Sequence, residues 1–125
     1  MTKVLFLDDM QARADVMRTK FQKLRHVTTS KIAIQLLYTD SYDLVCLDYD
    51  LDLATPGDFG MNVVDWLTDS KRKSETFFPE LREAEYVVHS TNLLMGTKMV
   101  RKLLESGYSA HYVPFSYLMG GPFNK

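Results

Sequence analysis

The side chains in this sequence that are best suited to chemistry are carboxylates that directly follow two apolar runs. They are Asp48, Asp50 and Asp52 after residues 44–47, and Asp8 and Asp9 after residues 3–7. An unbroken apolar run of this length is typical of a strand that is buried on both faces of a parallel sheet. A buried strand does not carry charges in its middle, so we expect the acids to lie at the C-terminal edge of the sheet. In open α/β sheets that edge is where ligands bind.

Carboxylates gathered at one edge of a sheet would repel one another. Like charges a few ångströms apart repel by kilocalories unless a cation lies among them or some of them are protonated. Carboxylate oxygens suit a hard cation such as Mg²⁺. The sequence therefore predicts a Mg²⁺ site formed by Asp8, Asp9 and Asp48, with Asp50 as a ligand-binding group. The alternative for these acids is a role in loops and helix caps, and Asp52 could equally be a solvated residue.

The composition narrows the class of protein. The chain has 125 residues, which fits one domain of common size, and we expect residues 1–125 to form a single domain. Its net charge of −1 creates no global field that would attract nucleic acid, so direct nucleic-acid binding is not expected. The one cysteine, Cys46, lies inside an apolar run, so a cytoplasmic location is favoured over one that supports a disulfide framework. No apolar stretch approaches the length of a membrane span, so membrane association is not expected.

Helical periodicity alternates with apolar runs along the chain. We expect strands at residues 3–7, 26–28, 43–47, 86–88 and 110–113, and helices at residues 10–24, 31–38, 61–69 and 98–105, with Asp9 and Ser30 as N-caps of the first two helices. Five strands alternating with helices predict an α/β fold with a parallel sheet and helices on both faces. Right-handed crossovers leave few topologies, and one of them is the flavodoxin-like strand order 2-1-3-4-5.

Two segments carry polar or chain-breaking residues that should end helices. The basic run at residues 70–74 is expected to end the third helix. The tail Phe115–Lys125 contains Gly120-Gly121-Pro122, so we expect it to be non-helical and the final helix of a flavodoxin-like fold to be missing.

The predicted strand order brings the ends of the first, third and fourth strands together. The fourth strand is followed by His89, Ser90, Thr91 and Asn92. His89 is the base at this edge that titrates near pH 7, so it is a candidate for general acid–base catalysis. Ser90, Thr91 and Asn92 are candidates for binding a ligand. Their alternatives are structural: a satisfied histidine, two turn residues, and an N-cap for the next helix.

The order of these motifs resembles the receiver domain of response regulators. The matching elements span nearly the whole chain and are Leu7-Asp8-Asp9, Leu47-Asp48, a hydroxyl residue Ser90 or Thr91, and Pro114-Phe115. The resemblance implies that the acid pair holds Mg²⁺, that Asp48 accepts a phosphoryl group, and that the hydroxyl group senses it. In that family a lysine before the Pro-Phe pair contacts the phosphoryl group, whereas this chain has Val113 there. The glycine that follows the acceptor arrives late, at Gly60, after an enlarged acidic loop.

A narrower set of motifs looks like a divergent group, the cyclic-phosphate-processing receiver domains. These motifs are Leu7-Asp8-Asp9-Met10 with Arg13, Leu47-Asp48-Tyr49-Asp50-Leu51, and His89-Ser90-x-Asn92-x-x-x-Gly96-x-x-Met99. That group has a histidine where this chain has Tyr49. The resemblance implies a ligand that carries phosphate, such as a cyclic phosphate or a nucleotide.

Three functions of different classes are therefore open. The chain binds a phosphate-bearing small molecule with Mg²⁺ and hydrolyses or transfers it, or it is a phosphoacceptor switch that uses Asp48, or it is a degenerate receiver that only binds other proteins. Whether it is an enzyme stays open among them.

Without a final helix, the apolar tail and the face of the sheet near Tyr112 and Val113 would be exposed to water. Burial of this apolar surface against a second copy of the chain favours a twofold homodimer. The alternative is that the tail folds back over its own sheet.

Overall fold

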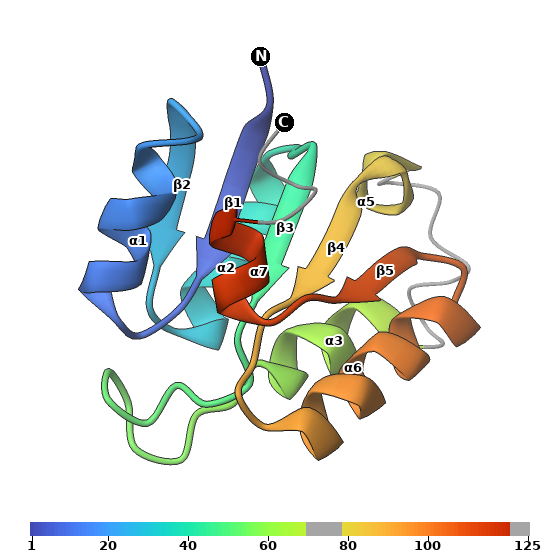
Figure 1. Cartoon of the computed structure of the whole chain (residues 1–125). Helices are drawn as coiled ribbons and strands as arrows, with labels where there is room; N and C mark the ends of the chain where they lie inside the picture. The colour runs from blue at the N-terminus through green and yellow to red at the C-terminus, as the bar shows by residue number, and fades with distance from the viewer. Residues whose placement is uncertain (70–78, 121–125) are drawn as a thin grey trace.

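The computed structural model describes residues 1–69 and 79–120 of the chain. At its centre is a five-stranded parallel sheet with the order β2-β1-β3-β4-β5, which confirms the predicted flavodoxin-like topology (Figure 1). The strands are β1 (Lys3–Leu7), β2 (Lys23–Val27), β3 (Leu44–Leu47), β4 (Glu85–Val88) and β5 (Ser109–Tyr112). The last two strands each begin one residue earlier than the sequence predicted.

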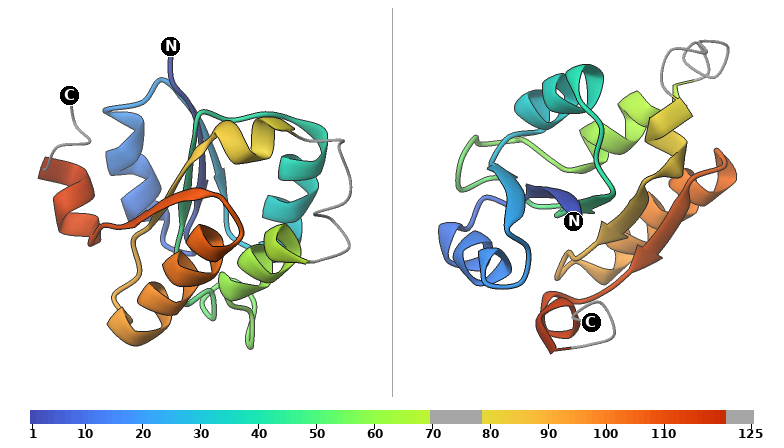
Figure 2. Two further views of the ribbon diagram at one scale, coloured as in Figure 1. Left: turned by 90° about the vertical axis from the view of Figure 1, so that its right-hand side faces the viewer. Right: turned by 90° about the horizontal axis from the view of Figure 1, so that it is seen from above.

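Helices cover both faces of this sheet, as the two views in Figure 2 show. They are α1 (Gln11–Arg18), α2 (Ser30–Thr39), α3 (Met61–Thr68), α5 (Pro79–Glu83), α6 (Leu93–Glu105) and α7 (Phe115–Gly120). Alternate residues of the central strands supply two cores. Leu5 and Leu7 pack with residues of α2, α3 and α6, whereas Val4 and Phe6 pack with residues of α1 and α7. Both faces of β1 and β3 are therefore buried, which explains their continuous apolar runs.

The predicted first helix and second strand have different boundaries in the structure. Helix α1 ends at Arg18 rather than at residue 24, because Leu24 belongs to β2 and pairs with Val4 across the sheet. Strand β2 accordingly begins at Lys23 rather than at residue 26. It lies at the edge of the sheet, and its Lys23 and Arg25 are exposed. The strand therefore lacks the continuous apolar run that identifies the central strands.

The helix caps and the start of α6 also differ from the predictions. Met10 rather than Asp9 precedes α1 as its N-cap, without a capping side-chain hydrogen bond. Thr29 rather than Ser30 caps α2, since its Oγ1 accepts a hydrogen bond from the Ile32 N–H at 3.3 Å. Helix α6 begins at Leu93 rather than at residue 98, because exposed leucines in its first turn obscure the helical pattern.

The prediction of a missing final helix is wrong for the part of the tail that is described. Residues Phe115–Gly120 form the short helix α7, in which the N–H of Leu118 donates to the carbonyl oxygen of Pro114 at 3.0 Å. Leu118 is fully buried and belongs to the same core as Val4 and Phe6. Gly120, the first of the chain-breaking residues, is the last residue of this helix, so the Gly-Gly-Pro sequence does not prevent the helix. Residues 121–125 and the basic run 70–74 lie outside the described residues.

The described helices are all too short or too polar to cross a membrane.

Candidate functional site

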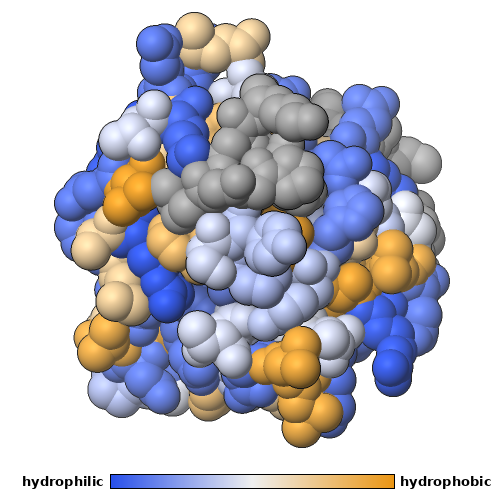
Figure 3. All heavy atoms as spheres, viewed as in Figure 1, coloured by the Kyte–Doolittle hydropathy of each residue, from blue (hydrophilic) through white to orange (hydrophobic). Residues whose placement is uncertain are grey.

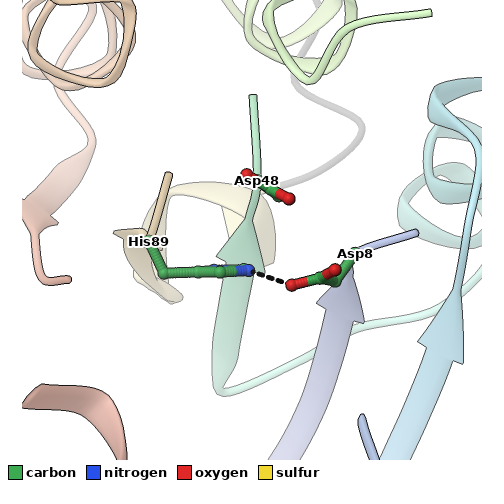
Figure 4. A group of neighbouring side chains, drawn as sticks. All are labelled: Asp8, Asp48 and His89. Atoms are coloured by element: carbon green, nitrogen blue, oxygen red, sulfur yellow. Dashed lines mark hydrogen bonds and ion pairs between the residues drawn. The ribbon is translucent and has the colours of Figure 1, made fainter. Parts of the chain in front are cut away.

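The candidate site lies where β1, β3 and β4 end side by side. Asp8, Asp48 and His89 each follow the last residue of one of these strands. The hydrogen bonds between neighbouring strands continue to these residues. The N–H of Asp48 donates to the carbonyl oxygen of Leu7, and the N–H of His89 donates to the carbonyl oxygen of Leu47, both at 3.0 Å. The three side chains point toward one another (Figure 4), and one ligating atom from each lies within 4.8 Å of the others.

Asp8 is the most firmly held of the three groups. Its side chain is fully buried, its Oδ1 accepts from the Met10 N–H at 2.8 Å, and its Oδ2 lies 3.0 Å from His89 Nε2. Burial on its own would raise the pKa of Asp8, but the hydrogen bonds from His89 and Met10 and the positive charge of Arg13 lower it below its ordinary value. Asp8 is therefore ionised at neutral pH.

His89 is completely buried and its ring stacks on Phe6, with 4.9 Å between ring centroids. Burial lowers the pKa of His89, and the neighbouring Asp8 carboxylate offsets this only in part. The imidazole is therefore neutral at neutral pH, with its Nε2–H donating to Asp8. Its other ring nitrogen, Nδ1, is buried and has no hydrogen-bond partner among the described residues.

Asp48 is the acid of the site whose ionised form is destabilised by its surroundings. Burial raises the pKa of Asp48 to about 7, the charges of Asp8 and Asp9 add to the effect, and Arg13 opposes it. Near pH 7 this carboxyl group is therefore protonated in a large fraction of molecules when no metal ion is present. A cation close to Asp48 would favour its ionised form.

Arg13 is a site residue whose role the sequence did not indicate. It lies in α1, and its Nη1 is 3.3 Å from Asp8 Oδ2 and 3.7 Å from Asp48 Oδ2. Its guanidinium carbon lies 5.1 Å from the centre of the Phe115 ring. The available signal was its spacing: Arg13 follows Asp9 by four residues and lies in the first turn of α1, which begins at Gln11.

Asp9 faces the loop between β3 and α3 instead of joining the three-residue group. Its Oδ2 accepts a hydrogen bond from the Leu53 N–H at 2.9 Å. The same loop is held by Asp52, which accepts from the Gly57 N–H at 2.7 Å, and by the fully buried Leu51. A metal-binding role for Asp9 stays a prediction, as does a ligand-binding role for the exposed Asp50.

Asp58 is a buried acid of this loop that serves the fold. Its carboxylate accepts hydrogen bonds from the backbone and hydroxyl of Ser30, from the Phe59 N–H and from Asn62. It therefore ties the loop to the first turn of α2 and the start of α3.

Gly60 explains why the glycine of this motif arrives late in the sequence. Its N–H donates to the carbonyl oxygen of Tyr49 at 2.7 Å. A Cβ atom at this position would lie 1.8 Å from the backbone oxygen of Asp48, which no side chain can accommodate without displacing the strand end. The enlarged loop returns to the end of β3 only at Gly60.

Side chains of the segment after His89 mainly organise the backbone. Ser90 is buried and its Oγ accepts from the Asn92 N–H at 3.0 Å. Asn92 is the N-cap of α6, with its Oδ1 accepting from the Met95 N–H at 3.1 Å. The structural alternatives expected for Ser90 and Asn92 are thus present, and Thr91 is exposed. Ligand binding by these three residues stays a prediction.

Solved structures of receiver domains resemble this chain over nearly all of its length. They include the Francisella response regulator 1452 receiver domain (21% identity, 95% of this chain and 91% of that chain, TM-score 0.62). A response regulator receiver domain from Methanospirillum hungatei JF-1 covers 96% of this chain and 89% of its own, at 14% identity and a TM-score of 0.64. The response regulator TrrA from Thermotoga maritima, solved in complex with Mg²⁺-BeF, covers 94% and 90% at 16% identity and a TM-score of 0.62. At these identities the likeness shows the receiver fold.

The family comparison is more specific than the structural one. No curated protein matches the chain. The family model described as the cyclic-phosphate processing receiver domain matches residues 3–105, a span that contains Asp8, Asp48 and His89. This match covers most of the sequence, and the chain therefore belongs to the cyclic-phosphate-processing receiver domain family.

Proposed function

We propose that this receiver domain binds a phosphate-bearing ligand together with a divalent cation such as Mg²⁺ at the ends of β1, β3 and β4. The observation that carries the proposal is the convergence of Asp8, Asp48 and His89, whose ligating atoms lie within 4.8 Å of one another. The family description, which concerns the processing of cyclic phosphates, supports cyclic phosphates and nucleotides as the first ligands to test.

The donors present fit a hard divalent cation. Asp8 and Asp48 would hold the ion through carboxylate oxygens, the ligands that Mg²⁺ prefers, and Asp9 would add a third carboxylate. The positive charge of the ion would offset the burial and the repulsion that raise the pKa of Asp48 to about 7. When bound, the ion would supply positive charge that polarises a phosphate group.

His89 would act on this site mainly through Asp8. Its Nε2 is engaged with the Asp8 carboxylate at 3.0 Å and its Nδ1 is buried, so in this state the ring positions Asp8. Orientation of a metal-binding carboxylate by such a neighbour is a common means of tuning metal affinity. A catalytic role for His89 is a further proposal that requires a turnover assay.

The start of α6 would meet the phosphate of the ligand. The helix has 13 residues and begins directly after Asn92. Unpaired backbone N–H groups at the N-terminus of a helix attract anions. Thr91 and Asp50 are exposed and would be accessible to the ligand, whereas Ser90 and Asn92 would hold the backbone in place.

A second candidate function is phosphoryl acceptance by Asp48. Two observations favour it: Asp48 lies at the end of β3, and a receiver of similar fold was solved with Mg²⁺-BeF. Incubation with acetyl phosphate, read by intact mass, separates the two candidates, because only acceptance by Asp48 leaves a phosphoryl group on the chain that Asp48→Asn abolishes. The third class, a module that only binds other proteins, predicts that no phosphate compound and no cation binds.

Thermal shift measurements test the proposal directly. Wild type, Asp48→Asn and the surface control Asp15→Asn would be compared with Mg²⁺ alone and with Mg²⁺ plus cyclic or linear nucleotides. We expect Mg²⁺ and at least one phosphate compound to raise the melting temperature of wild type and of the control, but not of Asp48→Asn. Absence of any shift in the wild type would sink the proposal.

A further inference from the structure

Arg13 lies between the buried carboxylates of the site and the solvent. Its side chain is 21% exposed, whereas the side chains of Asp8 and Asp48 are 0% and 7% exposed. One guanidinium nitrogen, Nη1, is shared by both carboxylates, at 3.3 Å from Asp8 and 3.7 Å from Asp48. Among the described residues, Arg13 is the one permanently charged cation within ion-pair distance of either carboxylate.

Phe115, the first residue of α7, holds Arg13 in this place by an aromatic contact. The guanidinium carbon lies 5.1 Å from the ring centroid of Phe115, within the range of a cation–π interaction. The same ring lies 6.1 Å from the ring of His89 and 6.3 Å from that of Phe6. Phe115 therefore holds the guanidinium of Arg13 beside the site by a contact that does not involve the carboxylates.

The hold of Arg13 on the carboxylates is incomplete. Strong arginine–carboxylate pairs use two parallel hydrogen bonds of about 2.7–2.9 Å. Here a single nitrogen serves two carboxylates at longer distances, so one positive charge is shared between Asp8 and Asp48. A divalent cation placed among the same oxygens would supply more charge and would repel the guanidinium beside it.

We propose that Arg13 is the counter-cation of the free site, that a divalent cation displaces it, and that the displaced guanidinium then binds the phosphate of the ligand. This inference rests on the proposed function. Once released, the planar fork of Arg13 would face an anion with two parallel N–H groups, the arrangement that best fits phosphate oxygens. The strand end nearby supplies no other cation, since Val113 is buried and apolar. Arg13 would therefore oppose the metal and favour the phosphate.

The two opposite effects of Arg13 can be separated by titration. The affinities of Mg²⁺ alone, and of inorganic phosphate at saturating Mg²⁺, would be measured for wild type, Arg13→Gln, Arg13→Lys and Arg18→Gln at pH 8.5, where Asp48 is largely ionised. In Arg13→Gln we expect Mg²⁺ to bind about tenfold tighter, from the loss of a unit positive charge beside the cation site. Phosphate should bind about tenfold more weakly, from the loss of a charge-assisted pair.

Two controls make the outcome specific. Arg18 lies on the same helix with its own ion pair to Asp15, so Arg18→Gln should leave both affinities unchanged. Arg13→Lys keeps the charge without the fork, so its Mg²⁺ affinity should stay near that of wild type while phosphate binding weakens. If both affinities change in the same direction in Arg13→Gln, or neither changes, the role assigned to Arg13 is wrong. A wild type that binds neither probe instead overturns the proposed function and this inference with it.

Discussion

At the scale of single residues, the raised pKa of Asp48 makes the stability of the fold depend on pH. Its pKa rises from an ordinary 3.8 to about 7, first because of burial and then because of Asp8. The folded chain therefore binds a proton more tightly than the unfolded chain does, and this group lowers stability as the pH rises from about 4 to about 7. Above about pH 8 the penalty is complete and constant, and is on the order of a few kcal/mol.

Asp48→Asn should therefore stabilise the protein in the presence of a chelator. At pH 8 we expect a higher melting temperature and a gain of about 2–4 kcal/mol in the free energy of unfolding, because a strained charge is removed. The gain should vanish toward pH 4, where the carboxyl group is protonated in both states. Asp15→Asn, on the exposed side of α1, is the control. A lower melting temperature for Asp48→Asn at pH 8 would show that the cluster is not electrostatically strained.

Variants of His89 test whether the hydrogen bond from its neutral imidazole to Asp8 sets the affinity for Mg²⁺. His89→Ala removes a fully buried ring and the hydrogen bond to Asp8, so we expect a loss of about 3 kcal/mol in stability and at least tenfold weaker Mg²⁺ binding. His89→Gln can still present an N–H to Asp8, so its Mg²⁺ affinity should lie near that of wild type. Calorimetric titration measures the Mg²⁺ affinity of the two variants. Equally weak binding in the two variants would contradict the positioning role.

At the scale of elements, the loop between β3 and α3 is built around its return to Asp48. Gly60→Ala would place a methyl group 1.8 Å from the Asp48 backbone oxygen, so we expect a loss of about 3 kcal/mol or more and weaker Mg²⁺ binding. Gly57 has a positive φ of 80° but no atom within 4 Å of an added Cβ. Gly57→Ala should therefore cost only about 1–2 kcal/mol of backbone strain and leave Mg²⁺ binding intact. Urea denaturation would rank the two variants, and equal losses would contradict this account of the loop.

The short helix α7 should contribute to stability through one side chain. Leu118 is fully buried, so Leu118→Ala should cost about 2–5 kcal/mol. Tyr117 is 61% exposed, and Tyr117→Ala should change stability by no more than about 0.5 kcal/mol. A small effect of Leu118→Ala in thermal denaturation would mean that α7 does not pack on the sheet in solution.

The elements that could be predicted from sequence are those with a single dominant signal. Strands β1 and β3 were recognisable because both of their faces are buried. The start of β2 was not, because an edge strand with exposed Lys23 and Arg25 carries no apolar run. Helix α7 was missed because its last residue, Gly120, begins a Gly-Gly-Pro sequence of the kind that ends helices. In each case the tertiary packing, not the local pattern, decided the boundary.

At the scale of the whole molecule, the candidate site also has parts that could be predicted from the sequence and parts that depend on tertiary packing. The sequence indicated which acids follow the strands, and the strand order then predicted that Asp8, Asp48 and His89 would meet. It could not indicate that Arg13 would reach two strand ends or that Phe115 would contact it. These contacts depend on how α1 and the start of α7 pack on the sheet.

The premise of the predicted homodimer has also changed. Leu118 of α7 covers part of the face that an absent helix would have exposed. On the side of the molecule seen in Figure 3, the apolar side chains of the described residues form separate small groups among polar ones. A large continuous apolar patch is what usually indicates an interface. Dimerisation stays a prediction, which sedimentation at micromolar concentration would measure.

The central claim is that the ends of β1, β3 and β4 form one cation site. Mn²⁺ is a paramagnetic substitute for Mg²⁺ that broadens the nuclear magnetic resonance signals of nearby residues, so a titration followed through backbone amides locates the ion. We expect the first signals to disappear at Asp8, Asp48 and His89, and excess Mg²⁺ to restore them. Broadening that begins instead at exposed acids such as Asp15 or Asp65, with these three unaffected, would contradict the claim.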